Sequence, residues 1–537
     1  MLSLIAVLGF VSVAFVNSQI PTFPDQYHAK GRVRLPYAEL DEPYEIWYDG
    51  PHKNSRVDWY DGMDKTIVLG DSIQYKYYYF DGKKACARLN GASLTTVLPD
   101  LKDYKYNGLH SVDGCKNKCH MLQSQTINGQ ENSTYRFYYE FDSAGNPIPR
   151  LFWFLGWDKL LGSHFDRYDI IYDKFDGNVS SGSFNITGNC HSGYPKKGDT
   201  DEEQDFSLNP ISHYMDQSSH KKIKHIFRHF KGKYNKRYGS HKEDSSRYVN
   251  FVKNLRFVHS KNRAGLSYEL AINHLADLHE HELRMMTGFR QKERSNEHLV
   301  DPDAKWFDKS KFLATSTIPT SWDWRQYGAV TPIKDQAICG TCWAFSATEN
   351  LEGLFFKQNG WLEYLAVQQI SDCSWAYGNH ACDGGNPSKA FKYIADFGGV
   401  ETVLNYGQYL GQDGICHANK SKAVLQISGY TRVDSQDNDA LMVALVEEGP
   451  ISISINAAVN SFYFYSRGVY DDPACKGSAD DLDHSVLLVG FGTLNGTPYW
   501  LVKNSWSNYW GDDGYVLVER DDQFICGIAT QPLFANA

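Results

Sequence analysis

Seven cysteines lie between Cys339 and Cys526, and an odd number cannot all form disulfides with one another. Three disulfides would fix the path of these residues and leave one thiol free. In a secreted chain the leftover cysteine is usually the reactive one. The segment from Gln336 to Trp343 selects Cys342, because a helix-like run begins there and a helix N-terminus stabilises a thiolate. The alternative is a buried structural cysteine.

The N-terminus of the chain predicts a signal peptide over residues 1–18. Residues 2–16 form a 15-residue apolar run that is too short to span a bilayer comfortably, and small side chains occupy positions 16 and 18. A short membrane anchor is the alternative, and no later stretch is apolar enough for a membrane span. Export makes Asn-x-Ser/Thr sequences candidate glycan sites. These are Asn132, Asn178, Asn185, Asn419 and Asn495.

Charge is distributed unevenly along the 537 residues. Residues 1–208 carry 21 basic and 27 acidic side chains, residues 209–317 carry 21 and 12, and residues 318–537 carry 12 and 25. The net charges are therefore −6, +9 and −13. A basic segment beside an acidic one predicts that the two bind each other. We therefore expect no nucleic acid partner, and the length predicts about three folded units.

Residues 19–195 are predicted to form a β-rich domain, as an antiparallel sheet or an open barrel. Aromatic runs such as residues 72–80 and 134–141 alternate with glycine- or aspartate-bearing turns. Four cysteines here can form two disulfides in three connectivities, and they are Cys86, Cys115, Cys119 and Cys190. Two of them with His120 also fit a metal site, but secretion favours disulfides. We expect no metal or other cofactor, and the domain's role stays open.

Residues 196–208 are highly charged and are predicted to be an exposed linker that proteases can reach. After them the apolar pattern becomes helical, since Ile223, Phe227 and Phe230 recur at helical spacing. A second helix is predicted over residues 242–263, and Gly265 ends it. A small helical bundle would explain these apolar residues but not the polar ones among them.

Four residues supply what a cysteine nucleophile requires. A thiol is mostly protonated at neutral pH, so catalysis requires a base, a group that orients the base, and donors for the oxyanion. His484 can exchange the proton with Cys342, Asn504 can accept the imidazole N–H, and Gln336 can donate to the oxyanion. Trp506 can shield the bond between base and amide from water. Alone, His484 is typical of a surface histidine, but the combination with Cys342 favours catalysis.

Residues 318–537 resemble the papain family of cysteine proteases. The opening at residues 318–325, the turn Cys382-Asp-Gly-Gly385 and the four positions above carry the resemblance. It implies a fold with a helical lobe and a β-barrel lobe, acyl-enzyme chemistry, and protein or peptide substrates. It also implies three disulfides that leave Cys342 as the single free thiol, and they are Cys339–Cys382, Cys373–Cys416 and Cys475–Cys526.

Residues 209–317 resemble the inhibitory propeptides of cathepsin-L-like members of that family. The resemblance rests on the helix spacing that includes Glu243, Arg247 and Phe251, and on the motif at residues 271–277. Asn250 departs from it, because a branched apolar residue is usual there. The resemblance implies a propeptide that runs backwards through the cleft and inhibits in cis. The fold class expected for the whole chain is therefore α+β and multidomain.

The resemblance also indicates the subclass and the substrate site. The 34 positions from Cys382 to Cys416 leave no room for the occluding insertion of dipeptidase relatives, which favours an endopeptidase. An apolar P2 side chain is expected, because no acidic residue stands at position 531 to attract arginine. The residues implied to bind substrate are Gly384, Gly385, Asn386, Pro387, Ser454, Leu482, Asp483, Trp506 and Gln531.

The whole chain resembles the two-chain 26/29-kDa-type cysteine proteases of insects. A cut near residues 196–210 would release the N-terminal fragment, which we expect to stay associated after processing. The expected location is the secretory pathway, ending in a lysosome, a granule or outside the cell. One alternative is a binding protein that acts through its β-rich domain, with the protease part secondary. Another is an inhibitor released from the propeptide that acts in trans.

Activation is expected in the acidic range where carboxylates titrate, because lysines keep their charge while the acidic partner domain loses its own. Ten of the nineteen histidines lie in residues 209–317. These histidines gain charge below about pH 6.5. From net charge alone, their protonation is expected to strengthen the attraction to the acidic domain until the carboxylates titrate.

Overall fold

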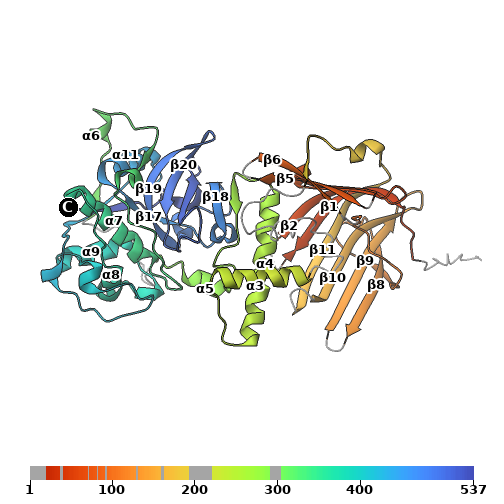
Figure 1. Ribbon diagram of the computed structural model, residues 1–537, viewed down its shortest axis with the longest axis horizontal. Helices are drawn as coiled ribbons and strands as arrows, with labels where there is room; N and C mark the ends of the chain where they lie inside the picture. Colours follow the sequence, from red (N-terminus) through yellow and green to blue (C-terminus); the bar gives the residue numbers. More distant parts are fainter. Residues whose placement is uncertain are drawn as a thin grey trace, which may run out of the picture. The chain divides into compact units, whose positions relative to one another are not determined.

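The computed structural model describes residues 20–36, 40–70, 72–80, 83–90, 94–128, 131–158, 163–192, 220–290 and 304–537. The chain divides into two compact units, residues 1–226 and residues 227–537, which follow one another along the colour scale of Figure 1. The predicted signal peptide and the predicted linker lie outside the described residues. Each unit is described separately below.

The first unit is built on one twelve-stranded sheet with the order β12-β6-β5-β4-β3-β2-β1-β11-β10-β9-β8-β7. Two meanders, β1 to β6 and β7 to β11, are joined where β1 pairs with β11. All pairs are antiparallel except β12 with β6. The strands are β1 (Gln26–Leu35), β2 (Leu40–Asp49), β3 (Asn54–Trp59), β4 (Asp64–Leu69), β5 (Ile73–Phe80), β6 (Lys83–Asn90), β7 (Lys105–His110), β8 (Cys119–Asn128), β9 (Glu131–Phe141), β10 (Pro147–Asp158), β11 (Ser163–Asp176) and β12 (His191–Ser192).

The segment between β6 and β7 packs against the buried tyrosines of this sheet. The Tyr27 hydroxyl lies 2.8 Å from Oγ1 of Thr96 and accepts the backbone N–H of Val97. The Tyr172 hydroxyl donates to the carbonyl of Val97. Both tyrosines and Val97 are buried. Buried hydroxyls keep partners in this way because an unpaired polar group in an apolar core is costly.

The disulfides of the first unit are Cys86–Cys190 and Cys115–Cys119. This is one of the three connectivities that the sequence left open. Cys86 lies on β6, and Cys119 begins β8. The metal alternative for Cys115 and Cys119 is excluded in this structure, because both sulfurs are oxidised and neither is a thiolate.

The second unit combines a helical segment with a two-lobed domain, as predicted. Its helices are α3 (His220–Lys233, which contains the division of the chain after residue 226), α4 (His241–Arg263), α5 (Glu280–Met285), α6 (Ser310–Leu313), α7 (Cys342–Asn359), α8 (Val367–Cys373), α9 (Pro387–Phe397), α10 (Val403–Tyr406), α11 (Asn438–Glu448) and α12 (Asn460–Tyr463). Its strands are β13 (Tyr268–Leu270), β14 (Lys305–Trp306), β15 (Trp322–Asp323), β16 (Gly429–Arg432), β17 (Ile451–Ile455), β18 (Tyr465–Tyr470), β19 (His484–Leu494), β20 (Thr497–Lys503), β21 (Tyr515–Glu519) and β22 (Leu533–Asn536).

Helix α4 begins and ends close to the predicted bounds. The Ser240 hydroxyl accepts the N–H of Glu243 and caps the N-terminus, and Gly265 with a φ of +65° follows the C-terminus. Phe251 of α4 packs against Phe227 and Phe230 of α3 with ring centroids 5.2 and 4.8 Å apart. The apolar residues at helical spacing therefore form the core of the helical segment.

Polar residues of α4 hold the next stretch of chain against it. Arg247 binds Glu282 through both guanidinium arms, and both side chains are mostly buried. Hydrogen bonds to Glu282 raise the pKa of Arg247, so this guanidinium stays charged. Asn250 donates to the carbonyl of Asp277 at 3.2 Å and lies 2.8 Å from Nδ1 of His279. The amide at this unusual position thus replaces apolar packing with two hydrogen bonds.

Figure 1 shows α7, α8 and α9 grouped in one lobe and β18, β19 and β20 in the other. The helical lobe has an apolar core to which Trp343 and Leu351 of α7, Ile370 of α8 and Phe391 of α9 contribute. The second lobe is built on the sheet β13-β18-β21-β20-β19-β17-β22-β16-β14. Two of its strands, β13 and β14, come from residues before 318 and lie at the two ends of this order.

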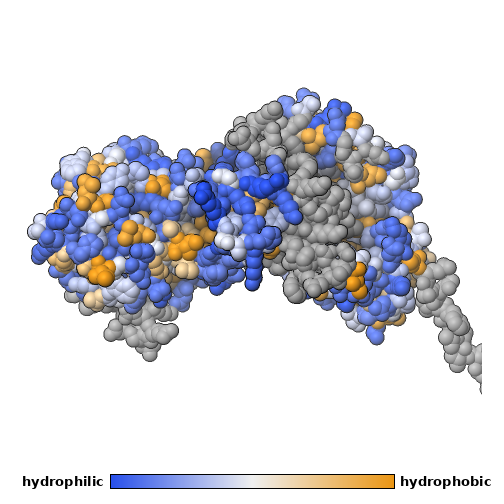
Figure 2. Space-filling view, turned by 60° about the horizontal axis from the view of Figure 1, so that its bottom comes forward, coloured by the Kyte–Doolittle hydropathy of each residue, from blue (hydrophilic) through white to orange (hydrophobic). Residues whose placement is uncertain are grey.

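No helix among the described residues is long and apolar enough to cross a membrane. Figure 2 shows apolar residues as separate patches among hydrophilic ones on the face in view. The five asparagines of the predicted glycan sites are all exposed. A glycosyltransferase could therefore reach each of them without unfolding of the surrounding backbone.

The two disulfides of the first unit should differ in their contribution to stability. Cys86–Cys190 closes a loop of 104 residues and Cys115–Cys119 a loop of 4. By loop-closure entropy, replacing the first pair with serines should lower the free energy of unfolding by about 5 kcal/mol and replacing the second pair by about 2 kcal/mol. Urea unfolding of the two double variants checks this. Equal losses would contradict the assignment.

Candidate active site

Cys342 is the first residue of α7, the long helix of the helical lobe. Its side chain is buried, and it is the one free cysteine among the described residues. The N-terminus of α7 carries a partial positive charge that favours a thiolate over a thiol. The helix ends at Gly360, whose φ of +78° only glycine adopts readily. The predicted helical run from residue 343 is thus positioned with the thiol at its positive end.

His484 and Asn504 come from neighbouring strands and form a hydrogen bond. His484 begins β19, and Asn504 directly follows β20, which pairs antiparallel with β19. The imidazole Nε2 lies 2.8 Å from the Asn504 carbonyl oxygen. Trp506 is fully buried with its ring centroid 4.7 Å from that of His484. The amide and the indole therefore fix the imidazole and exclude water from its bond to Asn504.

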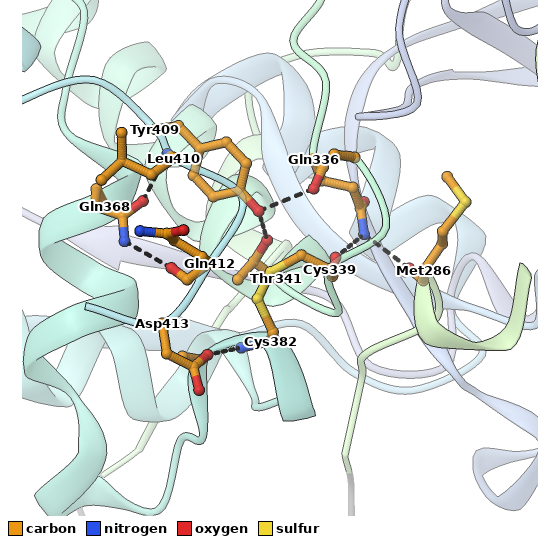
Figure 3. Close-up of a disulfide and its surroundings, with 12 residues drawn as sticks. Met286, Gln336, Cys339, Thr341, Gln368, Cys382, Tyr409, Leu410, Gln412 and Asp413 are labelled. Atoms are coloured by element: carbon orange, nitrogen blue, oxygen red, sulfur yellow. Dashed lines mark hydrogen bonds between the residues drawn. A yellow bond between two sulfur atoms is a disulfide. The ribbon is translucent and has the colours of Figure 1, made fainter. Parts of the chain in front are cut away.

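The side-chain amide of Gln336 points toward Cys339 and Met286 (Figure 3). Its Nε2 donates to the carbonyls of Cys339 and Met286, both at 2.8 Å. Its Oε1 accepts the Ser505 hydroxyl at 2.7 Å, and its backbone N–H donates to the Ser505 carbonyl at 2.9 Å. The Ser505 bond decides which way the amide faces, because a hydroxyl donor there fixes the carbonyl end. The N–H groups are therefore directed at the site.

Residues 286–290, which follow α5, lie across this site. The Gly288 N–H donates to Sγ of Cys342 at 3.3 Å, and the Phe289 N–H donates to the Asp483 carbonyl at 2.8 Å. Gly385 exchanges two further backbone hydrogen bonds with the segment, and Phe289 pairs with Gly385 in the parallel sense. The Met286 carbonyl, bound to Gln336, completes the contact. The thiol is thus covered on the side that a substrate would approach.

Burial of the thiol and the imidazole opposes charge on either group. Burial raises the pKa of Cys342 to about 12, although N–H groups of Ser485, Gly288 and Trp343 act against the rise. Burial also lowers the pKa of His484 to about 4, opposed by its bond to Asn504. The covered site therefore holds a neutral thiol and a neutral imidazole. The expected ion pair requires water to reach the site, because water stabilises both charges.

Among the predicted substrate-binding residues, Gly384, Gly385, Asn386 and Asp483 contact the covering segment. Gly384 and Gly385 allow close approach, since a Cβ on Gly384 would lie 2.5 Å from the Gly288 carbonyl. Asn386 and Pro387 begin α9, and the Asn386 amide lies 3.5 Å from the Arg290 carbonyl. The others come from the second lobe. The Ser454 hydroxyl, on β17, bonds the Ser485 hydroxyl, and the Asp483 carbonyl accepts the Phe289 N–H. Leu482 and Trp506 are buried, and Gln531 is half-buried before β22.

The disulfides of the second unit are Cys339–Cys382, Cys373–Cys416 and Cys475–Cys526. These are the pairs that the resemblance implies. Cys339–Cys382 ties the loop before Cys342 to the turn that carries Gly384, and the Gly340 N–H donates to the Cys382 carbonyl at 2.9 Å. The predicted oxyanion donors and the predicted substrate-binding glycines are therefore held together covalently.

Sequence reasoning missed two residues that orient Gln336. Ser505 follows Asn504 directly, and its position in that Asn-Ser pair is the signal that could have identified it. Tyr409 bonds the Gln336 carbonyl at 3.0 Å from 73 residues away, and no local pattern marks it. The covering residues Met286 and Gly288 were also missed, because they follow the recognised motif at residues 271–277.

Comparison with known families gives two matches within the second unit. Residues 318–536 match the model for papain family cysteine protease, and residues 227–283 match the cathepsin propeptide inhibitor domain (I29). A cathepsin L-like peptidase from Aedes aegypti is 40% identical over 316 residues, which is 57% of this chain and 91% of that protein. Cathepsin L1 of Drosophila melanogaster is 43% identical over 281 residues, 52% of this chain and 73% of that protein.

Solved structures of inactive precursors are also similar. Digestive procathepsin L 3 from the larval midgut of Tenebrio molitor is 32% identical, with a TM-score of 0.52, and the match covers 59% of this chain and 99% of that one. A stem bromelain precursor is likewise 32% identical with a TM-score of 0.52, over 58% and 98% of the two chains. The similarity therefore includes the segment that covers the site as well as the two lobes.

The covering segment can be displaced by one methyl group. A Cβ on Gly288 would lie 1.9 Å from the Gly340 carbonyl oxygen, and backbone cannot move aside cheaply. Gly288→Ala should therefore uncover Cys342 and raise its alkylation rate in the intact chain at pH 7.5 at least about tenfold. Iodoacetamide labelling with mass spectrometry measures this rate.

A matched control is Gly239→Ala, where the added Cβ would meet only a Glu243 carboxylate oxygen at an ordinary 3.6 Å. Its alkylation rate should equal that of the unchanged chain. If both variants label at the unchanged rate, residues 286–290 do not protect the thiol.

Proposed function

The chain belongs to the papain family of cysteine proteases, as a cathepsin L-like endopeptidase with its inhibitory propeptide, and we propose that it hydrolyses peptide bonds through an acyl-enzyme on Cys342. The observation that carries this proposal is the bonding of residues 286–290 to the thiol, the Gln336 amide and Gly385. A polypeptide already occupies the groups that a substrate would need. Removal of this segment exposes a site that is complete in its residues.

The proposed reaction begins once water reaches the uncovered site. The imidazole of His484 takes the proton of Cys342, and the helix dipole of α7 stabilises the thiolate. The sulfur attacks the scissile carbonyl carbon, a C–S bond forms, and the carbonyl π electrons move to oxygen. The Gln336 Nε2–H and the Cys342 backbone N–H stabilise that oxyanion. The Asn504 carbonyl accepts one N–H of the imidazolium, and this bond directs the other imidazolium N–H at the sulfur.

The intermediate then collapses and the enzyme is regenerated. The C–N bond breaks while His484 gives its proton to the leaving amine, which leaves an acyl group on Cys342. Water attacks the thioester, His484 takes a proton from it, and the C–S bond breaks to release the carboxylic acid. Atoms and charges balance without a cofactor, since the net reaction adds one water across one peptide bond.

We propose a preference for an apolar side chain at P2. Phe289 of the propeptide is buried, and its N–H donates to the Asp483 carbonyl, while its neighbours Gly288 and Arg290 bond Gly385; Asp483 and Gly385 are the groups expected to hold a substrate backbone. Leu482, which precedes Asp483, is buried and apolar. Gln531 carries no charge that would compensate a buried arginine. The support is thus an apolar propeptide residue at the place expected for P2.

Peptide hydrolysis tests the function and the P2 preference together. In the processed enzyme, kcat/KM for leucine or phenylalanine at P2 should exceed that for arginine at least about tenfold. Cys342→Ser should abolish hydrolysis of all of these peptides. Activity retained by Cys342→Ser would contradict the mechanism, whereas a preference for arginine would contradict only the proposed specificity.

We propose that His274 makes release of the propeptide sensitive to acid. Its ring packs against Tyr234 of the propeptide and Tyr509 of the protease, with centroid distances of 6.3 and 5.9 Å, and the two tyrosine rings lie 5.3 Å from each other. Its Nδ1 is buried with no hydrogen-bond partner in the described part of the chain. The ammonium of Lys236, which pairs with Asp277, adds repulsion. A proton on Nδ1 therefore has no hydrogen-bond acceptor among the described residues.

Whether acid strengthens or weakens docking of the propeptide follows from the pKa of His274 in the docked and in the released state. Burial, with a smaller effect from Lys236, lowers the pKa of His274 to about 4 from an ordinary 6.5. The docked state binds fewer protons than the released state, so docking is strongest above about pH 6.5 and weakens as the pH falls toward 4. From net charge, protonation of the propeptide histidines was expected to strengthen docking. The prediction is wrong for His274 on this account, because its burial outweighs the distant acidic field.

His274→Phe should shift acid processing to lower pH. Phenylalanine keeps the ring packing against both tyrosines but cannot take a proton, so the midpoint of self-processing should fall by roughly half a pH unit or more. Gel analysis after a fixed time between pH 4 and 7 measures the midpoint. Peptide hydrolysis by already processed enzyme is the control and should keep its pH profile, and an unchanged midpoint would remove His274 from the account.

The remaining parts of the chain complete the proposal. We propose a secretory route that ends in a lysosome, a granule or the extracellular space, with glycans on the exposed asparagines. We also propose the domain bounds 1–18, 19–195, 196–208, 209–317 and 318–537. Cleavage near residues 196–210 would separate the β-rich unit, which we propose stays with the protease.

A further inference from the structure

The hydroxyl of Tyr409 joins the two ends of the loop that precedes Cys342. It donates to the backbone carbonyl of Gln336 at 3.0 Å and also bonds the hydroxyl of Thr341, the residue just before Cys342 (Figure 3). Burial raises the pKa of Tyr409 well above its ordinary value, so the hydroxyl keeps its proton and remains a donor. One group therefore contacts both ends of a six-residue span.

The loop needs such a tie because its backbone is strained. Ala337 has a φ of +54°, a left-handed conformation that is unfavourable for a residue with a Cβ. The disulfide at Cys339 and the Gly340 hydrogen bond anchor the middle of the loop to Cys382. Tyr409 acts at the ends, where the two proposed oxyanion donors are carried. Relaxation of the strain would therefore change the spacing of those donors.

Tyr409 is itself held rigidly. Its ring packs edge-on against Phe345 of α7 with centroids 4.7 Å apart. The next residue, Leu410, donates its N–H to Oε1 of the buried Gln368 on α8, and Gln368 donates in turn to the Gln412 carbonyl. Asp413 accepts the N–H of Cys382 at 3.1 Å. Figure 3 shows these hydrogen bonds around the Cys339–Cys382 disulfide. The hydroxyl position is thus fixed by the helical lobe.

We propose that Tyr409 is a positioning residue for the reaction, whose hydroxyl sets the spacing between the Gln336 amide and the Cys342 N–H so that both donors meet one oxyanion. This inference rests on the proposed function, because it assumes that those two groups stabilise the oxyanion. Tyr409 acts through Gln336 and Thr341 and does not touch substrate. Misplaced donors weaken transition-state binding more than substrate binding.

Tyr409→Phe removes one oxygen and keeps the ring. In the processed enzyme, kcat for a peptide amide should fall about 10- to 100-fold while KM changes less than about threefold. The alkylation rate of Cys342 by iodoacetamide should stay within about twofold, because alkyl transfer forms no oxyanion. This split separates a positioning role from general damage to the thiol or the fold.

The matched control is Tyr406→Phe, at the C-terminal end of α10 three residues before Tyr409. Its hydroxyl donates to Asp372 at 2.8 Å, and its ring stacks on His417, away from residues 336–342. Its kcat should equal that of the unchanged enzyme even if its melting temperature falls. A loss of kcat as large as that of Tyr409→Phe would overturn the proposal.

A double-mutant cycle with Gln336→Ala completes the test. If Tyr409 acts partly through Gln336, Tyr409→Phe should lower kcat less in the Gln336→Ala background than alone. Full additivity, or a kcat for Tyr409→Phe within twofold of the unchanged enzyme, would overturn the inference. Low kcat in Gln336→Ala with normal kcat in Tyr409→Phe would leave the proposed function intact, whereas activity in Cys342→Ser would reject that function itself.

Discussion

A buried ion pair joins the helix that begins at Cys342 to the strand that precedes Asn504, and so connects the two lobes. Glu349 lies on α7 seven residues after Cys342, and Lys503 directly precedes Asn504. Their charged atoms lie 2.7 Å apart with both side chains almost fully buried, and Thr331 accepts a further hydrogen bond from Lys503. Removing one partner of such a pair typically costs about 3–5 kcal/mol, because the other charge stays buried. The pair thus fixes the thiol of one lobe relative to the His–Asn pair of the other.

The propeptide inhibits by presenting the wrong group to this fixed site. Its carbonyl at Met286 binds Gln336, and what faces the sulfur is the N–H of Gly288. An N–H stabilises the sulfur but offers no electrophilic carbon to attack. Phe289 pairs with Gly385 in the parallel sense. The segment therefore makes backbone hydrogen bonds like those of a bound peptide while it presents this N–H to the sulfur. Inhibition and resistance to cleavage therefore have one geometric origin.

Local patterns in the sequence predicted much of this structure. The helical run from Cys342 and the helix near residues 242–263 both follow from periodicity and capping signals. The pairing of Cys86 with Cys190 could not be predicted, since four cysteines allow three connectivities. The bond from Tyr409 to Gln336 could not be predicted either, because it joins residues 73 positions apart. The effect proposed for His274 could not be predicted from net charge, because it depends on the local surroundings of one buried ring.

The account depends on a thiol that becomes reactive only when the propeptide leaves. A direct measurement incubates the intact chain between pH 4 and 6 with a thiol-reactive epoxide, then sequences the N-termini of labelled and unlabelled fragments. The account predicts label on Cys342 alone, and only in molecules whose N-terminus lies beyond residue 290. Label on Cys342 in the intact chain at the rate of the processed enzyme would contradict it.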